Sequence, residues 1–165
     1  MSESALNVAP AELEIGVIDG ESYKLRDWLT SYPFLLVAID PYTVQSSWIL
    51  DTASEIFDHF TPADVRVGWI CSADSDGCSE FLGPLADRYL TIAAPDHKTT
   101  KALGVEALPS LIHIRSDGYL QRADGWDPTA WKKICDWVAK IAAWNEMSLR
   151  KPNMPGSYAG TPIAG

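Results

Sequence analysis

Two of the three cysteines in this sequence, Cys71 and Cys78, lie seven residues apart, and a reversible disulfide between them is one interpretation. Such a pair could exchange disulfides or reduce peroxides, because a thiolate is the nucleophile in both reactions. Asp74 and Asp76 lie between the two cysteines, and their negative charge is expected to raise the pKa values of the thiols and to weaken this reactivity. The third cysteine, Cys135, falls on the apolar face of an expected helix and is interpreted as core packing.

Other residue types that carry out catalysis form no clear constellation. His59, His97 and His113 are scattered, and no pair has the spacing of metal ligands, so neither a metal site nor a cofactor is predicted. His113 stands in the middle of an apolar strand and is interpreted as a core or edge residue. A triad built on Ser46 would lack a nucleophile elbow, and Asp40 is interpreted as a cap of the helix that follows it.

The composition is typical of a globular protein with one domain and tails. The chain has 165 residues, of which 47% are hydrophobic and 21% are charged. No stretch approaches the roughly 20 apolar residues that are needed to cross a bilayer, so membrane insertion is not expected. The first residues show no basic region followed by an apolar one. We therefore expect no secretion signal and a cytoplasmic protein with free thiols.

The negative charge is concentrated in one part of the chain. The net charge is −9, which argues against binding to nucleic acids or to anionic membranes. The stretch 40–87 contains nine acidic residues and one basic residue, Arg66, whereas the rest of the chain is almost neutral. Such a stretch would favour a basic segment of a partner protein.

Hydrophobic patterning predicts the elements that must position these residues. Continuous apolar runs at 34–39 and 65–71 are typical of strands buried on both faces of a mostly parallel sheet. Apolar residues recur at helical spacing over 43–60. A hairpin is expected within 110–122, and a last helix begins after Asp127. This order predicts an α/β fold with antiparallel strands added at one edge.

The domain organisation predicted from the sequence has three parts. Residues 1–12 form an N-terminal extension, 13–150 a single domain, and 151–165 a tail with three prolines and three glycines. The tail has no periodicity and cannot bury a face of its own. It is interpreted either as disordered or as an extended strap that docks on a partner through Met154, Tyr158 and Ile163.

The segment 102–118 resembles the thioredoxin superfamily. It contains the pair Gly104 and Val105, then the hydrophobic Leu108, and then Pro109 at the position of that family's cis-proline, before a strand and an Asp-Gly turn. The segment 18–29 is similar to the first hairpin and helix of the TlpA and peroxiredoxin branches. The resemblance covers roughly residues 13–143. It implies a thioredoxin-like fold in which helices flank a central mixed sheet, with a cis-proline loop at Pro109.

The sequence departs from this family at the active site. Thr43 and Ser46 occupy the positions of the two active-site cysteines, Tyr42 that of the tryptophan before them, and Val37 that of a buried acid. Aligned as a peroxiredoxin, the chain has Ser46 in place of the peroxidatic cysteine. A hydroxyl has a pKa far above that of a thiol and supports neither reaction. The departure therefore implies a redox-inactive chain that is not an enzyme.

What the resemblance leaves is a binding surface. Active thioredoxins hold extended peptides against the cis-proline loop, so a groove near Tyr42, Thr43, Leu108 and Pro109 is expected to bind a protein segment by backbone pairing. The sequence-based hypothesis is a chaperone-like accessory or assembly factor, or a subunit of a larger complex. The alternative is a divergent thiol-disulfide oxidoreductase or peroxidase that uses Cys71 and Cys78.

A narrower resemblance favours the first hypothesis. The cysteine-less accessory proteins of [NiFe] hydrogenase assembly, the HyaE/HoxO type, show motifs similar to three segments of this chain: 28–30 (Trp-Leu-Thr), 40–41 (Asp-Pro) and 125–131, from Gly125 to Trp131. It implies a redox-enzyme subunit with a basic signal peptide as the partner. Trp126, expected in a loop, is interpreted as an exposed anchor by which the chain could be a permanent subunit of a larger complex.

Overall fold

The computed structural model describes residues 8–149 and 154–163. The remaining residues, 1–7, 150–153 and 164–165, lie outside the described part, and with them much of the expected extension 1–12 and parts of the tail 151–165. The elements follow in the order β1 (Glu14–Gly16), β2 (Ser22–Lys24), α2 (Leu25–Leu29), β3 (Phe34–Ile39), α3 (Val44–Trp48), α4 (Leu50–Phe60), β4 (Arg66–Cys71), α5 (Ser75–Leu82), α6 (Leu85–Arg88), β5 (Leu90–Ala93), η1 (Pro95–His97), α7 (Lys98–Ala102), β6 (Ala107–Leu108), β7 (Ser110–Ile114), β8 (Leu120–Asp124), α8 (Pro128–Ile141) and β9 (Thr161–Pro162).

The predicted mixed sheet is confirmed, and its strand order is β5-β4-β3-β7-β8. Strands β3, β4 and β5 run parallel, whereas β7 and β8 pair antiparallel at the other side of β3. All six residues of β3 are buried because the strand is central and both faces of the sheet are covered. The parallel register places Ile39 beside Cys71, so the carboxyl ends of β3 and β4 meet at one edge.

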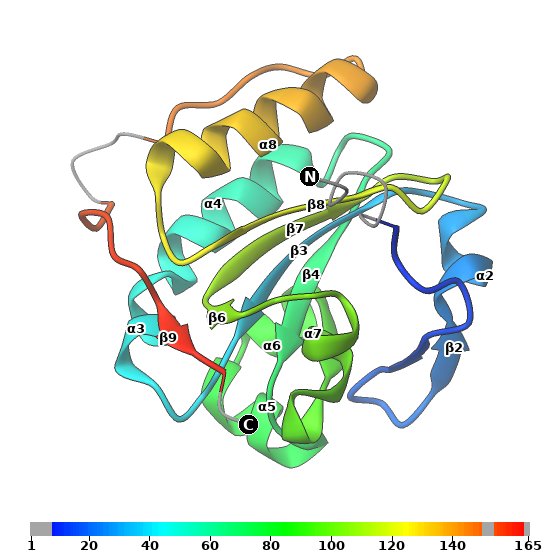
Figure 1. Ribbon diagram of the computed structural model, residues 1–165, viewed down its shortest axis with the longest axis vertical. Helices are drawn as coiled ribbons and strands as arrows, with labels where there is room; N and C mark the ends of the chain where they lie inside the picture. Colours follow the sequence, from blue (N-terminus) through cyan, green and yellow to red (C-terminus); the bar gives the residue numbers. More distant parts are fainter. Residues whose placement is uncertain (1–7, 150–153, 164–165) are drawn as a thin grey trace.

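Two hydrophobic clusters lie on opposite faces of the sheet. Figure 1 shows helices α4 and α8 on one side of the sheet and α2 on the other. Alternate residues of β3 divide between them, with Leu35 and Val37 in the cluster that includes residues of α4, α5 and α8. Leu36 belongs to the second cluster, which includes residues of α2.

Helix α8 begins after Asp127, as predicted from the sequence. The side chain of Asp127 caps the helix by accepting a hydrogen bond of 3.0 Å from the backbone N–H of Thr129.

The long helix expected over 43–60 is interrupted. It forms two helices, α3 and α4, which meet at the buried residue Ile49. The backbone N–H of Ile49 donates to the carbonyl oxygen of Ser46, three residues back, and this tightens the end of α3. Periodicity does not reveal the break, because apolar residues continue at helical spacing across it.

The last described segment of the chain is part of the fold. The Leu108–Pro109 bond at the end of β6 is cis, as the resemblance implied. Strand β6 pairs antiparallel with β9, so the end of the chain lies beside the cis-proline loop (Figure 1). Residues 154–163, for which disorder was one interpretation, are therefore ordered against the chain's own domain.

Candidate functional site

Two cysteines meet at the carboxyl edge of the parallel strands. Cys71 is the last residue of β4, and Cys78 lies in α5, the helix that follows the next loop. Both side chains are fully buried, and both cysteines are free thiols. The Cys78 Sγ–H donates to the carbonyl oxygens of Cys71 at 3.5 Å and of Ala73 at 3.4 Å. This strand, loop and helix bring together the two cysteines that the sequence singled out.

The proximity of the two thiols shifts their pKa values in opposite directions. A hydrogen bond from the Cys71 thiol lowers the pKa of Cys78 against the opposing effect of burial. The same contact, together with burial, raises the pKa of Cys71 far above its ordinary value. Cys78 is therefore the thiol that ionises first, with Cys71 as the donor that stabilises its thiolate.

The expectation that the acidic loop would raise both pKa values is wrong for Cys78. Asp74 does act in that direction, but the hydrogen bond from Cys71 outweighs it. The carboxylate of Asp74 caps α5 by accepting from the backbone N–H of Gly77 at 2.8 Å. The negative charge of Asp74 is thus stabilised by a backbone N–H group at the start of α5.

A polar cluster lies beside the cysteine pair at the positions where the family has its own cysteines. The hydroxyl of Ser46 accepts from the backbone N–H of Asp40 at 2.9 Å, and the hydroxyl of Thr43 lies 3.1 Å from it. The Asp40 carboxylate accepts from the backbone N–H of Tyr42, so it closes a turn and does not cap α3 as expected. The Nε2 atom of His97 lies 3.8 Å from Asp40 Oδ2. No motif connects His97 to Asp40 in the sequence.

Asp40 links this cluster to the cysteines, because its charge contributes to the raised pKa of Cys71. The surface above the pair is formed by the loop after β3. Tyr42 is 81% exposed, and its hydroxyl would lie 3.8 Å from a Cβ added at Gly77. A surface cavity of about 370 Å³ lies between this loop and α5, lined by Pro41, Tyr42, Gly77, Glu80 and Phe81.

The groove predicted for a protein segment is occupied along one side by the chain itself. Leu108 is buried and pairs with Thr161 of β9. Pro109 is also buried, whereas Tyr42 stays exposed and Thr43 is half-buried. The groove residues thus lie at one end of the sheet, but the backbone edge of β6 is already paired.

The residues predicted to anchor the tail on a partner contact the chain's own domain. Met154 and Tyr158 pack against the cluster that includes α4 and α8, and Ile163 packs against the other cluster. Trp126 is fully buried, which corrects its interpretation as an exposed anchor. Its indole N–H donates to the carbonyl oxygen of Pro155 at 2.8 Å. Because these contacts are distant in sequence, local patterning could not reveal them.

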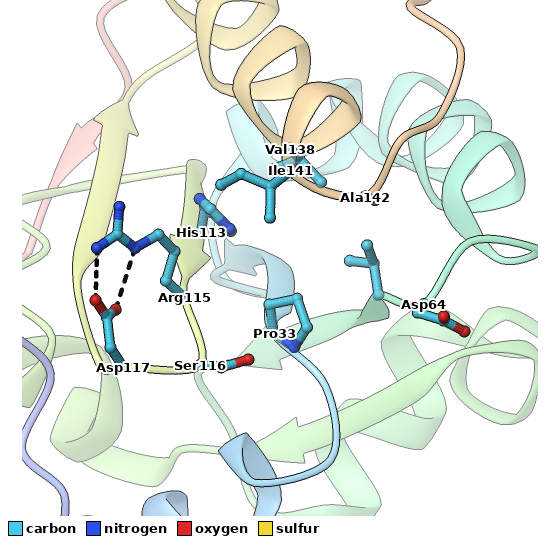
Figure 2. A pocket seen from close by; sticks show the side chains of 10 residues that line it. Pro33, Asp64, His113, Arg115, Ser116, Asp117, Val138, Ile141 and Ala142 are labelled. Atoms are coloured by element: carbon cyan, nitrogen blue, oxygen red, sulfur yellow. Dashed lines mark hydrogen bonds and ion pairs between the residues drawn. The ribbon is translucent and has the colours of Figure 1, made fainter.

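A larger cavity, of about 460 Å³, lies at the opposite end of the sheet from the cysteines (Figure 2). Residues of α8 and of the segments before β3 and β4 form part of its wall, including Pro33 and Val138. Arg115 and Asp117 form an ion pair at its side, which holds the pKa of Asp117 at about 2. His113 is fully buried, and its Nδ1 lies 3.0 Å from Gln121 Oε1. This agrees with its interpretation as a core residue.

His113 is expected to make stability depend on pH. Burial lowers the pKa of His113, so the unfolded chain takes up this proton at a higher pH than the folded chain does. The contribution of neutral His113 to the free energy of unfolding is therefore full above about pH 6.5 and is lost as the pH falls below that value. Urea unfolding near pH 7.5 and near pH 5.5 should show a loss of stability that is smaller in His113→Phe. An equal loss in both proteins would contradict this assignment.

Cys135 is buried in the core, as predicted, and burial raises its pKa to about 12. No group of three or more potential ligands is arranged to hold a metal ion within residues 8–149 and 154–163. In the same part of the chain, no helix is long and apolar enough to cross a membrane.

Comparison with known proteins shows the fold. No protein-family model matches this sequence, and no curated protein matches it. The structure of DsbF from MTB in mixed oxidised and reduced forms is 14% identical, with a TM-score of 0.63 over 82% of this chain and 97% of that one. A secreted Mycobacterium tuberculosis disulfide oxidoreductase homologous to E. coli DsbE is 16% identical, with a TM-score of 0.59 over 81% and 96%. The thioredoxin domain of a thiol-disulfide oxidoreductase from Bacteroides vulgatus is 12% identical, with a TM-score of 0.63 over 82% and 95%.

These similarities correct the main functional hypothesis. The chain was expected to be redox-inactive and not an enzyme because hydroxyls replace the cysteines at Thr43 and Ser46. The structure instead brings two buried free thiols together at the carboxyl edge of the same sheet, and the similar structures include disulfide oxidoreductases. The accessory-factor, chaperone and hydrogenase-assembly interpretation is therefore not carried further. At these identities the likeness itself establishes a thioredoxin-like α/β fold.

Proposed function

We propose that this chain, with its thioredoxin-like fold, is a thiol-disulfide oxidoreductase whose redox centre is the pair Cys71 and Cys78. The observation that carries the proposal is that the two buried free thiols come together at the carboxyl edge of β3 and β4, where the Cys78 Sγ–H donates to the carbonyl oxygen of Cys71 at 3.5 Å. The usual centre of the fold follows the strand equivalent to β3, where this chain has Thr43 and Ser46. Here the dithiol follows the neighbouring strand β4 in the same order of strand, loop and helix.

The unequal acidities assign a role to each cysteine. The Cys78 thiolate attacks one sulfur of a substrate disulfide, the substrate S–S bond breaks, and the released thiolate takes up the proton that Cys78 lost. Cys71 then attacks the sulfur of Cys78 in this mixed disulfide. The Cys71–Cys78 bond forms, and the second substrate thiolate leaves with the proton from Cys71. The substrate gains two electrons and two protons, which the protein dithiol loses.

Burial determines how a substrate reaches the pair. Both cysteine side chains are fully buried, so local opening of the structure must precede the reaction with a disulfide. Asp76 and Glu80 are exposed on α5 next to this surface. Their charge supports a basic segment as the preferred protein substrate. We place this chemistry in the cytoplasm, where the pair would rest as the dithiol.

The proposal predicts a two-electron titration that involves only two of the three cysteines. The full chain is equilibrated with mixtures of reduced and oxidised glutathione, the remaining thiols are blocked, and the mass is measured. We expect the wild-type chain to lose two thiols together and to keep one. Cys135→Ser serves as the matched control and should titrate in the same way, because Cys135 is buried in the core.

The single variants decide the result. Neither Cys71→Ser nor Cys78→Ser can form the internal disulfide, so neither should reach the oxidised state of the wild-type chain. If the folded wild-type chain keeps all three thiols in an excess of oxidised glutathione, the proposed function is wrong. The proposed function is likewise wrong if the Cys135→Ser control does not show the two-electron transition of the wild-type chain.

A further inference from the structure

The cavity at the opposite end of the sheet from the cysteines is built from regular elements. It lies between the end of α8 and the end of the sheet at which β3 and β4 begin and β7 ends (Figure 2). Its volume of about 460 Å³ falls within the range of about 300–1,000 Å³ that is typical of small-molecule sites. Because a helix and strands form its wall, the shape of the cavity exists before a ligand arrives.

Much of the wall is apolar. Val138, Ile141 and Ala142 line the cavity from the last turn of α8. Pro33 and Val65, which directly precede β3 and β4, line it from the end of the sheet. A ligand that replaces water against these side chains gains the free energy of burying apolar surface. The ligand is therefore expected to have an apolar body.

The wall also contains a buried polar atom without a partner. The Nδ1 atom of His113 lies 3.0 Å from the Oε1 atom of Gln121. Its Nε2 atom is buried and has no hydrogen-bond partner among the residues that the structure describes. An unpaired buried acceptor or donor costs free energy, and most buried polar atoms are paired for this reason. The Nε2 atom of His113 therefore marks a place where the polar group of a ligand would gain a hydrogen bond.

The partner of Nδ1 determines which kind of group can pair with Nε2. A carboxamide oxygen only accepts hydrogen bonds, so the Nδ1 atom of His113 carries the proton. Burial lowers the pKa of His113, so the imidazole is neutral at pH 7. In this tautomer the Nε2 atom is an acceptor, and its partner must be an O–H or an N–H group.

The charged residues at the cavity restrict the ligand further. Arg115 forms an ion pair with Asp117, so the two charges offset each other. Asp64 is exposed and lies on the opposite side of the cavity from this pair (Figure 2). Its carboxylate would repel an anionic ligand. An uncharged ligand therefore fits the cavity better than an anion does.

We propose that this cavity binds a small uncharged molecule with an apolar body and one O–H or N–H donor, and that the donor pairs with the Nε2 atom of His113. The apolar body lies against Val138 and Ile141. Because the Nε2 atom is covered, a neighbouring side chain must change its rotamer before the donor reaches it. Ile141 is the last residue of α8 and is 46% exposed, so its side chain has room to rotate.

Three single-ring molecules test this inference with the full wild-type chain. Phenol has the ring and the donor, anisole carries a methyl group in place of the hydroxyl hydrogen, and toluene has no polar group. Binding is measured by titration calorimetry near pH 7.5. We expect phenol to bind at least about tenfold more tightly than anisole or toluene, because only phenol satisfies the buried acceptor. If phenol does not bind, or if all three bind equally, the inference is wrong.

Two substitutions locate the site. Ala142→Phe places a ring in the cavity and should prevent the binding of phenol. Ala130→Phe is the matched control, because Ala130 is also half-buried and lies on α8 but outside this cavity. His113→Phe keeps an aromatic ring and removes the acceptor, so phenol should lose its advantage over toluene. Phenol binding that is unchanged in Ala142→Phe would overturn the inference.

The ¹⁵N resonance of His113 Nε2 in the wild-type chain tests the hydrogen bond without any substitution. It should shift when phenol is added and stay unchanged when toluene is added. A resonance that phenol does not move would contradict the proposed contact even if phenol binds to the chain.

This inference does not depend on the chemistry proposed for Cys71 and Cys78. Binding is measured with all thiols reduced and no disulfide present. A chain that binds phenol as described but forms no internal disulfide overturns the proposed function alone. A chain that forms the internal disulfide but does not bind phenol overturns the ligand site alone.

Discussion

Replacing Cys71 by alanine is expected to raise the pKa of Cys78, because it removes the hydrogen bond that contributes most to lowering it. Each pKa unit changes the thiolate fraction at neutral pH about tenfold. The change is measured by the ultraviolet absorbance of the thiolate as a function of pH, in a Cys135→Ala background with a single remaining thiol. Cys71→Ser retains a hydroxyl donor and should show a smaller rise.

The reciprocal variant should shift in the opposite direction. In Cys78→Ala, Cys71 loses the contact that contributes most to its raised pKa, whereas burial still acts on it. Its pKa should therefore fall from the wild-type value and remain above that of an exposed thiol. If both single variants move in the same direction, the two thiols are not joined by a hydrogen bond.

The same asymmetry predicts which cysteine is trapped by a substrate. With oxidised glutathione, Cys71→Ser should accumulate a mixed disulfide on Cys78, since the thiol that would resolve it is missing. Cys78→Ser should accumulate far less, because burial still raises the pKa of Cys71 when the Cys78 thiol is absent. Mass spectrometry of the two intact variants measures this difference directly, and the reverse pattern would exchange the roles of the two cysteines.

Gly68→Ala is expected to lower the free energy of unfolding by about 3 kcal/mol, the upper range for forcing extra atoms into a packed interior. Gly68 lies in β4 and pairs with Leu90 of the neighbouring strand. An added Cβ would lie 2.3 Å from the Leu90 carbonyl oxygen and 2.7 Å from its Cβ. Neither atom belongs to the flexible end of a side chain, so the strands themselves would have to move apart.

Gly16→Ala is the matched control for this effect. Gly16 also lies in a strand, β1, but the nearest atom to its added Cβ is 3.9 Å away and its φ is not positive. Urea unfolding of both variants should show a large loss of stability for Gly68→Ala alone. Equal small changes would mean that β4 and β5 can separate without cost. Because β4 ends at Cys71, the loss should be accompanied by altered thiol reactivity.

The sheet was largely predictable because its strands carry strong local signals. The run at 34–39 has no polar residue, and such a run is stable only when both faces of a strand are covered, which β3 confirms. Strand β5 gave no clear signal because it is short. The break between α3 and α4 was missed because it leaves the apolar spacing unchanged.

The site was only partly predictable. Cys71 and Cys78 were recognisable as a pair, but the sequence-based argument weighed only the charges of the nearby acids. It could not include the effect of the neighbouring Cys71 thiol, which reverses the direction of the pKa shift for Cys78. The interaction of His97 with Asp40 joins residues that no local pattern connects.

The sequence alone determined the α/β class of fold and the absence of thiols at Thr43 and Ser46, because these depend on residue type and short-range order, whereas the cis-proline at Pro109 was implied by the family resemblance and is shown by the structure. Only the tertiary structure decided that Cys78 of α5 meets Cys71 at the end of β4 and that Tyr158 holds the tail on its own domain. Both results depend on contacts between different elements of the fold. Their free energy comes from burial and pairing that exist only once the sheet has formed.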